Sequence, residues 1–234
     1  HTVIGPHVVI QGPAVIGARN RIAAGVCLGG DPQDVGYRGE NTWLRIGDDN
    51  VIREHVTIHR GTPKGRGETV IGNGNYIMTH VHVGHDCRIG DRIVLTHGVG
   101  LSGFVEIEDR AIVGGMTGLH QFVRVGTMAM VGGCSYVHKD VPPFMLVSGN
   151  PARVWGPNTV GLRRNGLDSA TRLRLKAAFR RLYRSGLNIS QALESLEQEM
   201  DDPHIAHLIR FIRGSRRGVL DGAAGRRHEE EGEA

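Results

Sequence analysis

Three histidines, His80, His82 and His85, lie within six residues of one another. Imidazole changes its protonation state near neutral pH and also binds zinc, so this group could supply a general base or a metal site. Polar side chains on a solvent-exposed face are the simplest alternative. The choice depends on where each histidine points, and the pattern of the surrounding chain sets that direction.

The surrounding chain repeats with a period of six residues. From Ile71 to Val137 an aliphatic residue occupies every sixth position without exception. This spacing fits neither helical periodicity nor simple strand alternation, and a short period sustained this long is typical of a solenoid. Glycine often follows the aliphatic residue, which suits sharp corners between short strands. The sequence predicts an all-β left-handed parallel β-helix of hexapeptide repeats, with the handedness of that repeat class.

The period also orients the histidines. Val81 and Val83 occupy inward positions, so alternation points His80 and His82 outward, while His85 falls at the next corner. None of the three side chains is therefore expected in the core.

Counting by 18 places a glycine beside His85. Three hexads make one coil of 18 residues, and neighbouring coils lie about 4.8 Å apart, so residues 18 apart are stacked. His85 is followed in this file by Gly103 and then by Gln121, with His120 next to it. An imidazole can accept a proton, and a glycine N–H can face an oxyanion without an intervening side chain. This combination suits acyl transfer.

Zinc binding is the competing interpretation. The three histidines could each offer an imidazole, and some carbonic anhydrases built from hexapeptide repeats use histidines of facing subunits. The neighbouring coil, however, supplies Gly103 at this file rather than another ligand. We therefore expect no metal.

The composition is compatible with a slim β-helix. Of 234 residues, 35 are glycine and only 5% are aromatic, which suits tight corners around an aliphatic core. No Gly-X-Y period is present and the aliphatic pattern is regular, which excludes collagen and disorder. No apolar run approaches the length of a membrane span, and no signal peptide pattern opens the chain. Cys87 falls on an inward position, so a reduced, buried thiol is expected, which favours the cytoplasm.

The repeat divides the chain into regions. We expect the β-helix over residues 1–150, with external loops at about 29–44 and 60–69, where the repeat is interrupted. The first loop is expected to replace part of a coil. Residues 151–220 are expected to form an α-helical domain, and the charged residues 221–234 a disordered tail.

Three helices are expected in the helical domain. Asp168 is a suitable N-cap for the first, the second covers residues 189–200, and Pro203 opens a third that ends near Ile212. The first helix and the segment before it are basic, with Asp168 as the only acidic residue among Arg163, Arg164, Arg172, Arg174, Lys176, Arg180, Arg181 and Arg184. This is either a solvated face or a docking surface for an acidic partner. Nucleic acid is not expected, because aromatic residues are not interleaved.

Several motifs are more specific than the repeat. They are Ile58-His59-Arg60-Gly61-Thr62, His82-Val83-Gly84-His85-Asp86-Cys87, Gly114-Gly115-Met116-Thr117-Gly118-Leu119-His120-Gln121-Phe122, Val131-Gly132-Gly133-Cys134-Ser135, Asp140-Val141-Pro142-Pro143 and Tyr183-Arg184-Ser185-Gly186. With these motifs the chain, from its first repeat to about Leu220, resembles the acyl-carrier-protein-dependent UDP-N-acetylglucosamine O-acyltransferases, which catalyse the first step of lipid A synthesis. Family members have about two more coils before the residue that matches His1.

The resemblance implies a role for each matching residue. His85 matches the general base that deprotonates the 3-hydroxyl of the glucosamine, Asp86 the residue that assists it, and Gly103 the amide that faces the oxyanion. Asp34 matches a ligand of a sugar hydroxyl. Gly133 matches the position that sets acyl-chain length, where glycine implies a groove long enough for about a 3-hydroxymyristoyl chain. The residues that match the walls of the cleft between subunits are His59, His82, His120, Gln121, Asn158 and Arg164.

The resemblance also implies partners. It predicts a cytoplasmic homotrimer that takes its acyl chain from the phosphopantetheine of an acyl carrier protein, with no other cofactor and no metal. The acidic carrier protein would then contact the basic helices.

The chain departs from the family at three positions. Gly36, Phe104 and Val160 stand where relatives commonly have Lys, His and Glu. The base and oxyanion positions are kept, so these departures bear on recognition of the nucleotide sugar. Three alternatives remain. The protein could form an amide on a 3-amino UDP-sugar or be a related N-acyltransferase. It could instead be a non-catalytic structural trimer, or a zinc-dependent carbonic anhydrase.

Overall fold

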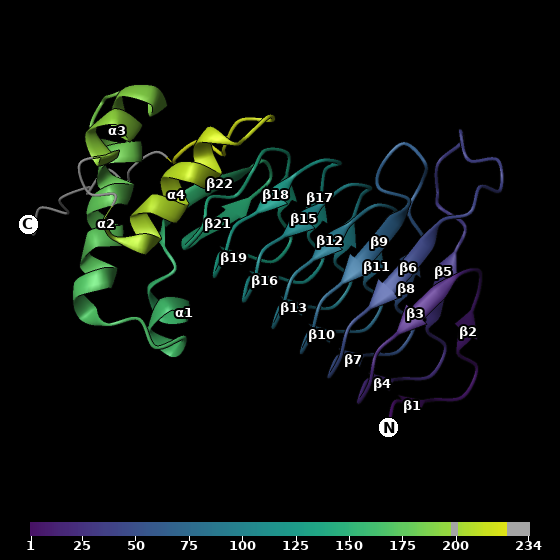
Figure 1. Ribbon diagram of the computed structural model, residues 1–234. Helices are drawn as coiled ribbons and strands as arrows, with labels where there is room; N and C mark the ends of the chain where they lie inside the picture. The colour runs from purple at the N-terminus through teal and green to yellow at the C-terminus, as the bar shows by residue number, and fades with distance from the viewer. Residues whose placement is uncertain (198–200, 224–234) are drawn as a thin grey trace, which may run out of the picture.

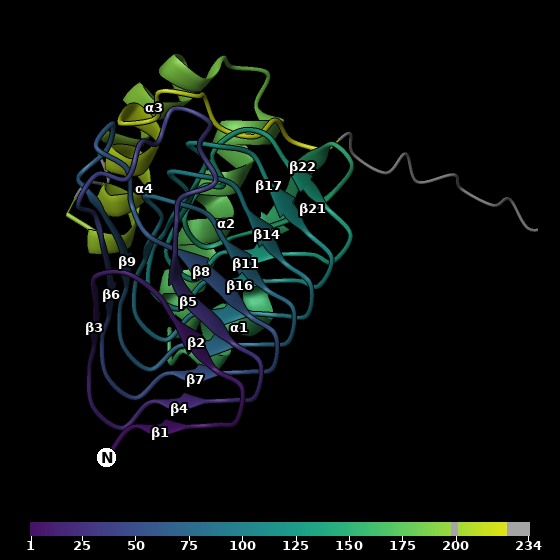
Figure 2. The same cartoon turned by 90° about the vertical axis from the view of Figure 1, so that its right-hand side faces the viewer.

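The computed structural model describes residues 1–197 and 201–223. Short strands pair in parallel with the strand one coil away, which produces three sheets around a common axis. Figure 1 shows the coils side by side with the helices at the C-terminal end, and Figure 2 looks along the stack. This is the left-handed parallel β-helix that the hexapeptide period predicts.

The sheets are named A, B and C in the order in which each coil crosses them. Sheet A contains β1 (Val3–Ile4), β4 (Arg21–Ile22), β7 (Val51–Ile52), β10 (Tyr76–Ile77), β13 (Val94–Leu95), β16 (Ile112–Val113), β19 (Met130–Val131), β21 (Met145–Gly149) and β22 (Ala152–Pro157). Sheet B contains β2 (Val9–Ile10), β5 (Cys27–Gly30), β8 (Thr57–His59), β11 (His82–Val83), β14 (Gly100–Leu101), β17 (Gly118–Leu119) and β20 (Tyr136–Val137). Sheet C contains β3 (Ala14–Ile16), β6 (Trp43–Ile46), β9 (Glu68–Ile71), β12 (Arg88–Ile89), β15 (Glu106–Ile107) and β18 (Arg124–Val125).

The aliphatic residues of the repeat fill the axis of the coils. Ile77, Val83 and Ile89, one from each sheet, are at most 2% exposed. Removal of this apolar surface from water is the main stabilising contribution, at about 25 cal/mol per Å². Cys87 lies in the same core, where burial raises the pKa of its thiol to about 12, so the thiol stays protonated and unreactive.

Asn20, Asn50 and Asn75 form a buried ladder at the corner that joins sheet C to sheet A. The Oδ1 atoms of Asn20 and Asn50 each accept the backbone N–H of the next asparagine at 2.9 Å, and Asn75 Oδ1 accepts the N–H of Ile93 at 2.8 Å. Each Nδ2 donates to a carbonyl oxygen of the adjoining turn, those of Gly47, Gly72 and Gly90. The ladder thus pairs backbone groups that the corner would otherwise bury unsatisfied.

Asn50→Ala is expected to destabilise the β-helix by about 3 kcal/mol, because the N–H of Asn75 and the carbonyl of Gly72 would lose their partners. Urea unfolding followed by circular dichroism measures the effect. Asn41→Ala, at an exposed loop position, serves as the control and should shift the midpoint little. Equal shifts in the two variants would contradict the structural role of the ladder.

Two loops project from the β-helix, residues 31–42 between β5 and β6 and residues 60–67 between β8 and β9 (Figure 1). Stacked residues are normally 18 apart, as in Tyr76 and Val94, but they are 30 apart across the first loop and 25 across the second. The loops therefore add 12 and 7 residues to complete coils. The prediction that the first loop replaces part of a coil is wrong, because β5 and β6 are consecutive strands of one coil.

Both loops leave the β-helix at the same corner. We call it the B–C corner, the set of turns that join a strand of sheet B to the next strand of sheet C. The turn after β11 contains His85 and Asp86, the turn after β14 contains Gly103, and the turn after β17 begins with His120. The predicted file of His85, Gly103 and Gln121 is therefore present and lies directly beyond the two loops.

The β-helix ends in an antiparallel pair of strands, β21 and β22. The second of these occupies residues 152–157, which were expected to belong to the helical domain. The helices that follow are α1 (Thr159–Arg164), α2 (Ser169–Arg184), α3 (Ile189–Leu196) and α4 (Pro203–Arg213). The short α1 was not expected, α3 ends before residue 200, and residues 198–200 lie outside the described residues. None of the described helices has the length and apolarity that a membrane span requires.

The helices are fastened to the end of the β-helix. Asp168 caps α2 as predicted, since its side chain accepts the N–H of Thr171 at 2.7 Å. From α4, His207 Nε2 lies 2.8 Å from Glu108 Oε2 on the adjoining β-helix. The expected disordered tail began at residue 221, but residues 221–223 run beside β22, where Gly222 pairs with Val154. The rest of that tail, residues 224–234, lies outside the described residues.

Candidate active site at the B–C corner

A cleft of about 920 Å³ lies along the B–C corner on the side of sheet B. Most of the residues singled out in the sequence line it together, although they come from one loop and three coils: Asp34, His82, His85, Gly103, His120 and Gln121. Gln33, Lys64, Ser102 and Tyr136 are further polar residues of the lining.

His85 and Asp86 form a hydrogen-bonded pair at the corner. His85 Nδ1 lies 2.8 Å from Asp86 Oδ2, and each residue is 6% exposed. A carboxylate only accepts hydrogen bonds, so Nδ1 carries the proton and Nε2 is the basic nitrogen. Asp86 has a φ of 61°, and this left-handed conformation turns the chain sharply after His85.

The second loop holds Asp86 in place. Both carboxylate oxygens lie 3.0 Å from the N–H of Thr62, and Oδ2 also accepts the hydroxyl of Thr62 at 2.7 Å. The N–H of Asp86 donates to Thr69 Oγ1 at 2.8 Å. The role of Thr62 was missed in the sequence, because counting by 18 does not include the seven residues that the loop adds. Its position in the motif that begins at Ile58 was the available signal.

Asp86→Asn is expected to lower kcat by about 10- to 100-fold, because an amide replaces the charge-assisted hydrogen bonds to His85 and Thr62. Single-turnover assays with acyl donor in excess would measure it. Asp91→Asn is the matched control, since Asp91 accepts a backbone N–H at a different corner. Unchanged turnover in Asp86→Asn would show that the carboxylate does not orient the imidazole.

Gly103 lies directly against the imidazole of His85. A Cβ atom at this position would stand 2.5 Å from Cε1 and 2.6 Å from Nε2 of His85, closer than any real Cβ contact. In the described part of the chain, no acceptor forms a hydrogen bond with the backbone N–H of Gly103. The backbone N–H groups of His85 and Gln121, which occupy the equivalent position of neighbouring coils, also have no acceptor there. A free amide is thus a property of the corner, and at Gly103 no side chain shields it.

His82 and His59 lie on neighbouring strands of sheet B, with ring centroids 5.2 Å apart. Burial lowers the pKa of His82, and the nearby His59 and His85 lower it further, so its imidazole is neutral at physiological pH. Its Nδ1 is 2.8 Å from the hydroxyl of Thr57, and His59 Nδ1 donates to the carbonyl of Asp31 at 2.6 Å. These partners fix both rings beside the cleft.

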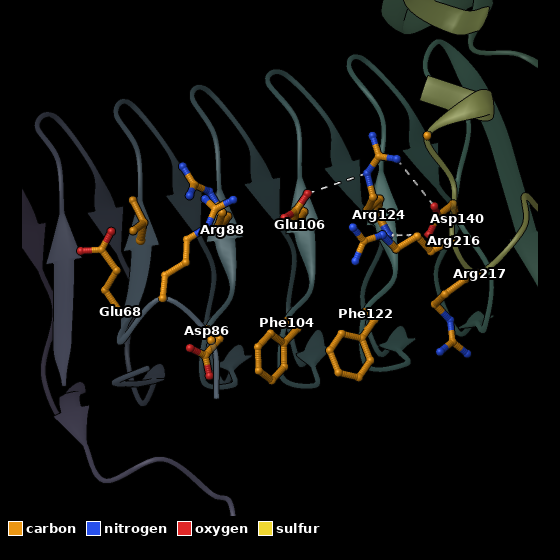
Figure 3. Close-up of a pocket in the computed structure, with 14 residues that line it drawn as sticks. Glu68, Asp86, Arg88, Phe104, Glu106, Phe122, Arg124, Asp140, Arg216 and Arg217 are labelled. Carbon is orange, nitrogen blue, oxygen red and sulfur yellow. Dashed lines mark hydrogen bonds and ion pairs between the residues drawn. The ribbon is translucent and has the colours of Figure 1, made fainter. Parts of the chain in front are cut away.

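A second cleft, of about 720 Å³, lies on the other side of the B–C corner, against sheet C (Figure 3). Asp86 and Phe104 line it, whereas the residues before them, His85 and Gly103, line the first cleft. Phe104 meets the His85 ring edge-on at 5.4 Å and stacks on Phe122 at 4.7 Å. The phenyl groups, labelled in Figure 3 beside Asp86, therefore back the pair from the side opposite the first cleft.

Three predicted residues lie elsewhere in the chain. Arg164 lines a separate pocket on the side of sheet A, together with Arg92 and Arg110. Asn158 caps α1, accepting the N–H of Gly161 at 3.1 Å and donating to the carbonyl of Met128 at 2.9 Å. Gly133 is an exposed residue at the corner that joins sheet A to sheet B. A single chain does not bring these three into the cleft.

Among the described residues of the single chain, the zinc interpretation concerns groups of three ligands. Within residues 1–197 and 201–223, no group of three His, Cys, Asp or Glu residues has a geometry that could hold a metal ion. His80 instead stacks on His55 and meets His97 edge-on, outside the cleft.

Comparison with known proteins identifies the family. Residues 140–220 match the model of domain 2 of UDP-N-acetylglucosamine O-acyltransferase. The acyl-[acyl-carrier-protein]–UDP-N-acetylglucosamine O-acyltransferase of Syntrophobacter fumaroxidans is 48% identical over 92% of this chain and 84% of its own, and that of Tolumonas auensis is 48% identical over 94% and 84%.

Solved structures agree with the relatives. The UDP-N-acetylglucosamine acyltransferase of Francisella novicida superimposes with a TM-score of 0.90 at 38% identity, covering 95% of this chain and 89% of its own. These similarities agree with two features of the structure, which are the β-helix with its helical end and the histidine–carboxylate pair beside a bare glycine amide. The chain belongs to the family of acyl-carrier-protein-dependent UDP-N-acetylglucosamine O-acyltransferases.

Proposed function

We propose that this protein transfers a 3-hydroxyacyl chain from acyl carrier protein to the 3-hydroxyl of UDP-N-acetylglucosamine, the first step of lipid A synthesis. The observation that carries the proposal is the contact between the His85 imidazole and the bare backbone of Gly103 within one cleft. The names of the relatives give the donor and the acceptor.

The geometry suits a single transfer step. His85 Nε2 takes the proton of the 3-hydroxyl as the oxygen attacks the thioester carbonyl, while Asp86 accepts the proton-bearing Nδ1–H. The oxyanion develops beside the N–H of Gly103. Collapse of the tetrahedral intermediate breaks the C–S bond, and the imidazolium returns its proton to the departing phosphopantetheine thiolate. No cofactor beyond that carrier-bound arm is required.

The remaining lining residues then position the acceptor. Asp34 would accept a hydroxyl of the sugar, and His82, His120 and Gln121 would line the path of the nucleotide sugar and the pantetheine arm. His120 Nδ1 donates to the carbonyl of Gln121 at 3.1 Å, and His82 Nδ1 contacts the hydroxyl of Thr57. The Nε2 atom of each histidine is therefore available to a substrate.

We further propose a homotrimer in which a neighbouring subunit completes the cleft. Asn158, Arg164 and Gly133 lie away from the cleft of their own chain, as expected of residues that serve the next subunit. An open corner at Gly133 would leave room for an acyl chain of about the 3-hydroxymyristoyl length. The basic surface of α2 would receive the acidic carrier protein in the cytoplasm, where the free Cys27, Cys87 and Cys134 would stay reduced.

Mass spectrometry of the products tests the proposal. The protein would be offered a mixture of acyl-carrier-protein thioesters together with UDP-N-acetylglucosamine or its 3-amino analogue. We expect an ester on UDP-N-acetylglucosamine with a preferred chain of about 14 carbons. If an amide forms only on the 3-amino analogue, the protein is an N-acyltransferase rather than an O-acyltransferase. If neither acceptor gives a product, the proposed function is refuted.

A further inference from the structure

The two loops of the B–C corner are tied together by two cationic side chains that differ in burial. Arg60 is 8% exposed and donates to the carbonyl of Gly29, the hydroxyl of Tyr37 and the carboxylate of Asp31. A buried guanidinium with three partners is a structural fastener, since each lost contact would leave an unpaired buried group. Arg60 therefore helps to hold the first loop to the β-helix, together with the contact of His59 Nδ1 with the carbonyl of Asp31.

Lys64 makes a different kind of contact. Its ammonium group lies 2.8 and 2.7 Å from the two carboxylate oxygens of Asp34, with a side chain that is 58% exposed. Exposed ion pairs of this kind contribute little to stability, so fastening the loops does not account for it. The side chain of Asp34, by contrast, is 12% exposed and faces the cleft.

Gly36 makes room for the lysine. A Cβ atom at position 36 would lie 2.7 Å from Lys64 Nζ and 3.0 Å from Asp34 Oδ1. The backbone of Gly36 does not have the positive φ that excludes other residues, so a side chain at this position would act by displacing the ammonium group of Lys64 rather than by straining the backbone. The ammonium of Lys64 thus stands where a side chain of the first loop would otherwise project.

Lys64 is also the only lysine or arginine among the described residues that line the cleft. His82, another residue of the lining, is neutral because burial lowers the pKa of its imidazole. An acceptor that carries a diphosphate brings two negative charges into this space, and a charge-assisted contact to an ammonium group offsets their desolvation.

We propose that Lys64 is the substrate-positioning residue that binds the diphosphate of the acceptor, from the place left open by Gly36, while the adjoining Asp34 binds the sugar. This inference rests on the proposed function and assigns the recognition of its acceptor to the second loop. In the free protein the ammonium is held beside Asp34, ready to contact a phosphate oxygen without reorganisation of either loop.

Lys64→Met tests the assignment. The KM for UDP-N-acetylglucosamine should rise roughly 10- to 100-fold while kcat changes less than about twofold, since a contact present in both ground and transition states is lost. Calorimetric titration with UDP should show a loss of affinity of the same size. Lys139→Met is the matched control, because it removes another lysine–aspartate pair, with Asp221, and Lys139 is not one of the residues that line the cleft.

A relocation variant makes the test specific. Gly36→Lys in a Lys64→Gly background returns an ammonium to the same space from the other loop and should restore most of the affinity for UDP. Gly36→Lys alone should not improve binding, because it crowds Lys64. Equal UDP affinity in Lys64→Met and the Lys139→Met control would overturn the assignment, as would a rise only in the KM for the carrier thioester.

The UDP titration requires no turnover. Failure of the proposed function, seen as no product from the unmodified protein, is therefore distinguishable from failure of the Lys64 assignment.

Discussion

Replacing His85 with alanine is expected to lower kcat by about 10²- to 10⁴-fold, the range typical for loss of a general base. Nε2 is the basic nitrogen of the cleft, because Asp86 engages Nδ1 and the backbone of Gly103 lies beside Nε2. Affinity for UDP should change little.

Rapid-quench measurement of acyl transfer, with both substrates saturating, would separate this loss from weaker binding. His80→Ala is the matched control, because His80 lies two positions before His82 on the same turn of the β-helix but outside the cleft. Near-normal turnover in His85→Ala would refute the role of His85 as the base. A similar loss in both variants would point to damage of the fold, which thermal unfolding would detect.

Gly103→Ala is expected to lower kcat by about 100-fold or more. The added methyl group would stand 2.5 Å from His85 Cε1, so the imidazole must move, and a misplacement of about 1 Å can cost that factor. The same methyl group would shield the N–H that faces the oxyanion. The effect should fall on kcat rather than on the KM of either substrate.

Gly156→Ala provides the control for the added methyl group. Gly156 lies in β22, and a Cβ atom there meets nothing within 4 Å. Its turnover and melting temperature should match those of the unmodified protein. A Gly103→Ala variant that behaved in the same way would show that the close approach of the glycine backbone is not required for transfer.

The period of six residues predicted most of the fold and the centre of the site. Because each coil has a fixed length, the sequence separation of His85 and Gly103 converts directly into a contact between neighbouring coils, and the structure has that contact. The N-cap of α2 at Asp168 followed from residue type alone.

The loops limited what could be predicted. They add 12 and 7 residues, numbers that no period supplies, so Thr62 and Lys64 could not be placed beside Asp86 and Asp34 by counting. The antiparallel return of β22 against β21 also breaks the repeat, and no period of the sequence distinguishes residues 152–157 from the helical region that begins at residue 151 in the prediction. In the proposed trimer, Asn158 and Arg164 line a cleft that forms between two subunits, so a single chain does not contain it.

The B–C corner has a consequence for how this protein can be altered. Elsewhere in the coils, one inserted or deleted residue would turn the aliphatic side chains outward and break every downstream stack. The two loops escape this constraint, and both stand next to the cleft that contains His85 and Gly103. Changes in the first loop, and in the second loop away from Thr62, can therefore redesign acceptor selectivity while the spacing between imidazole and amide stays fixed. Chemistry and specificity are thus separately evolvable within a single corner of the molecule.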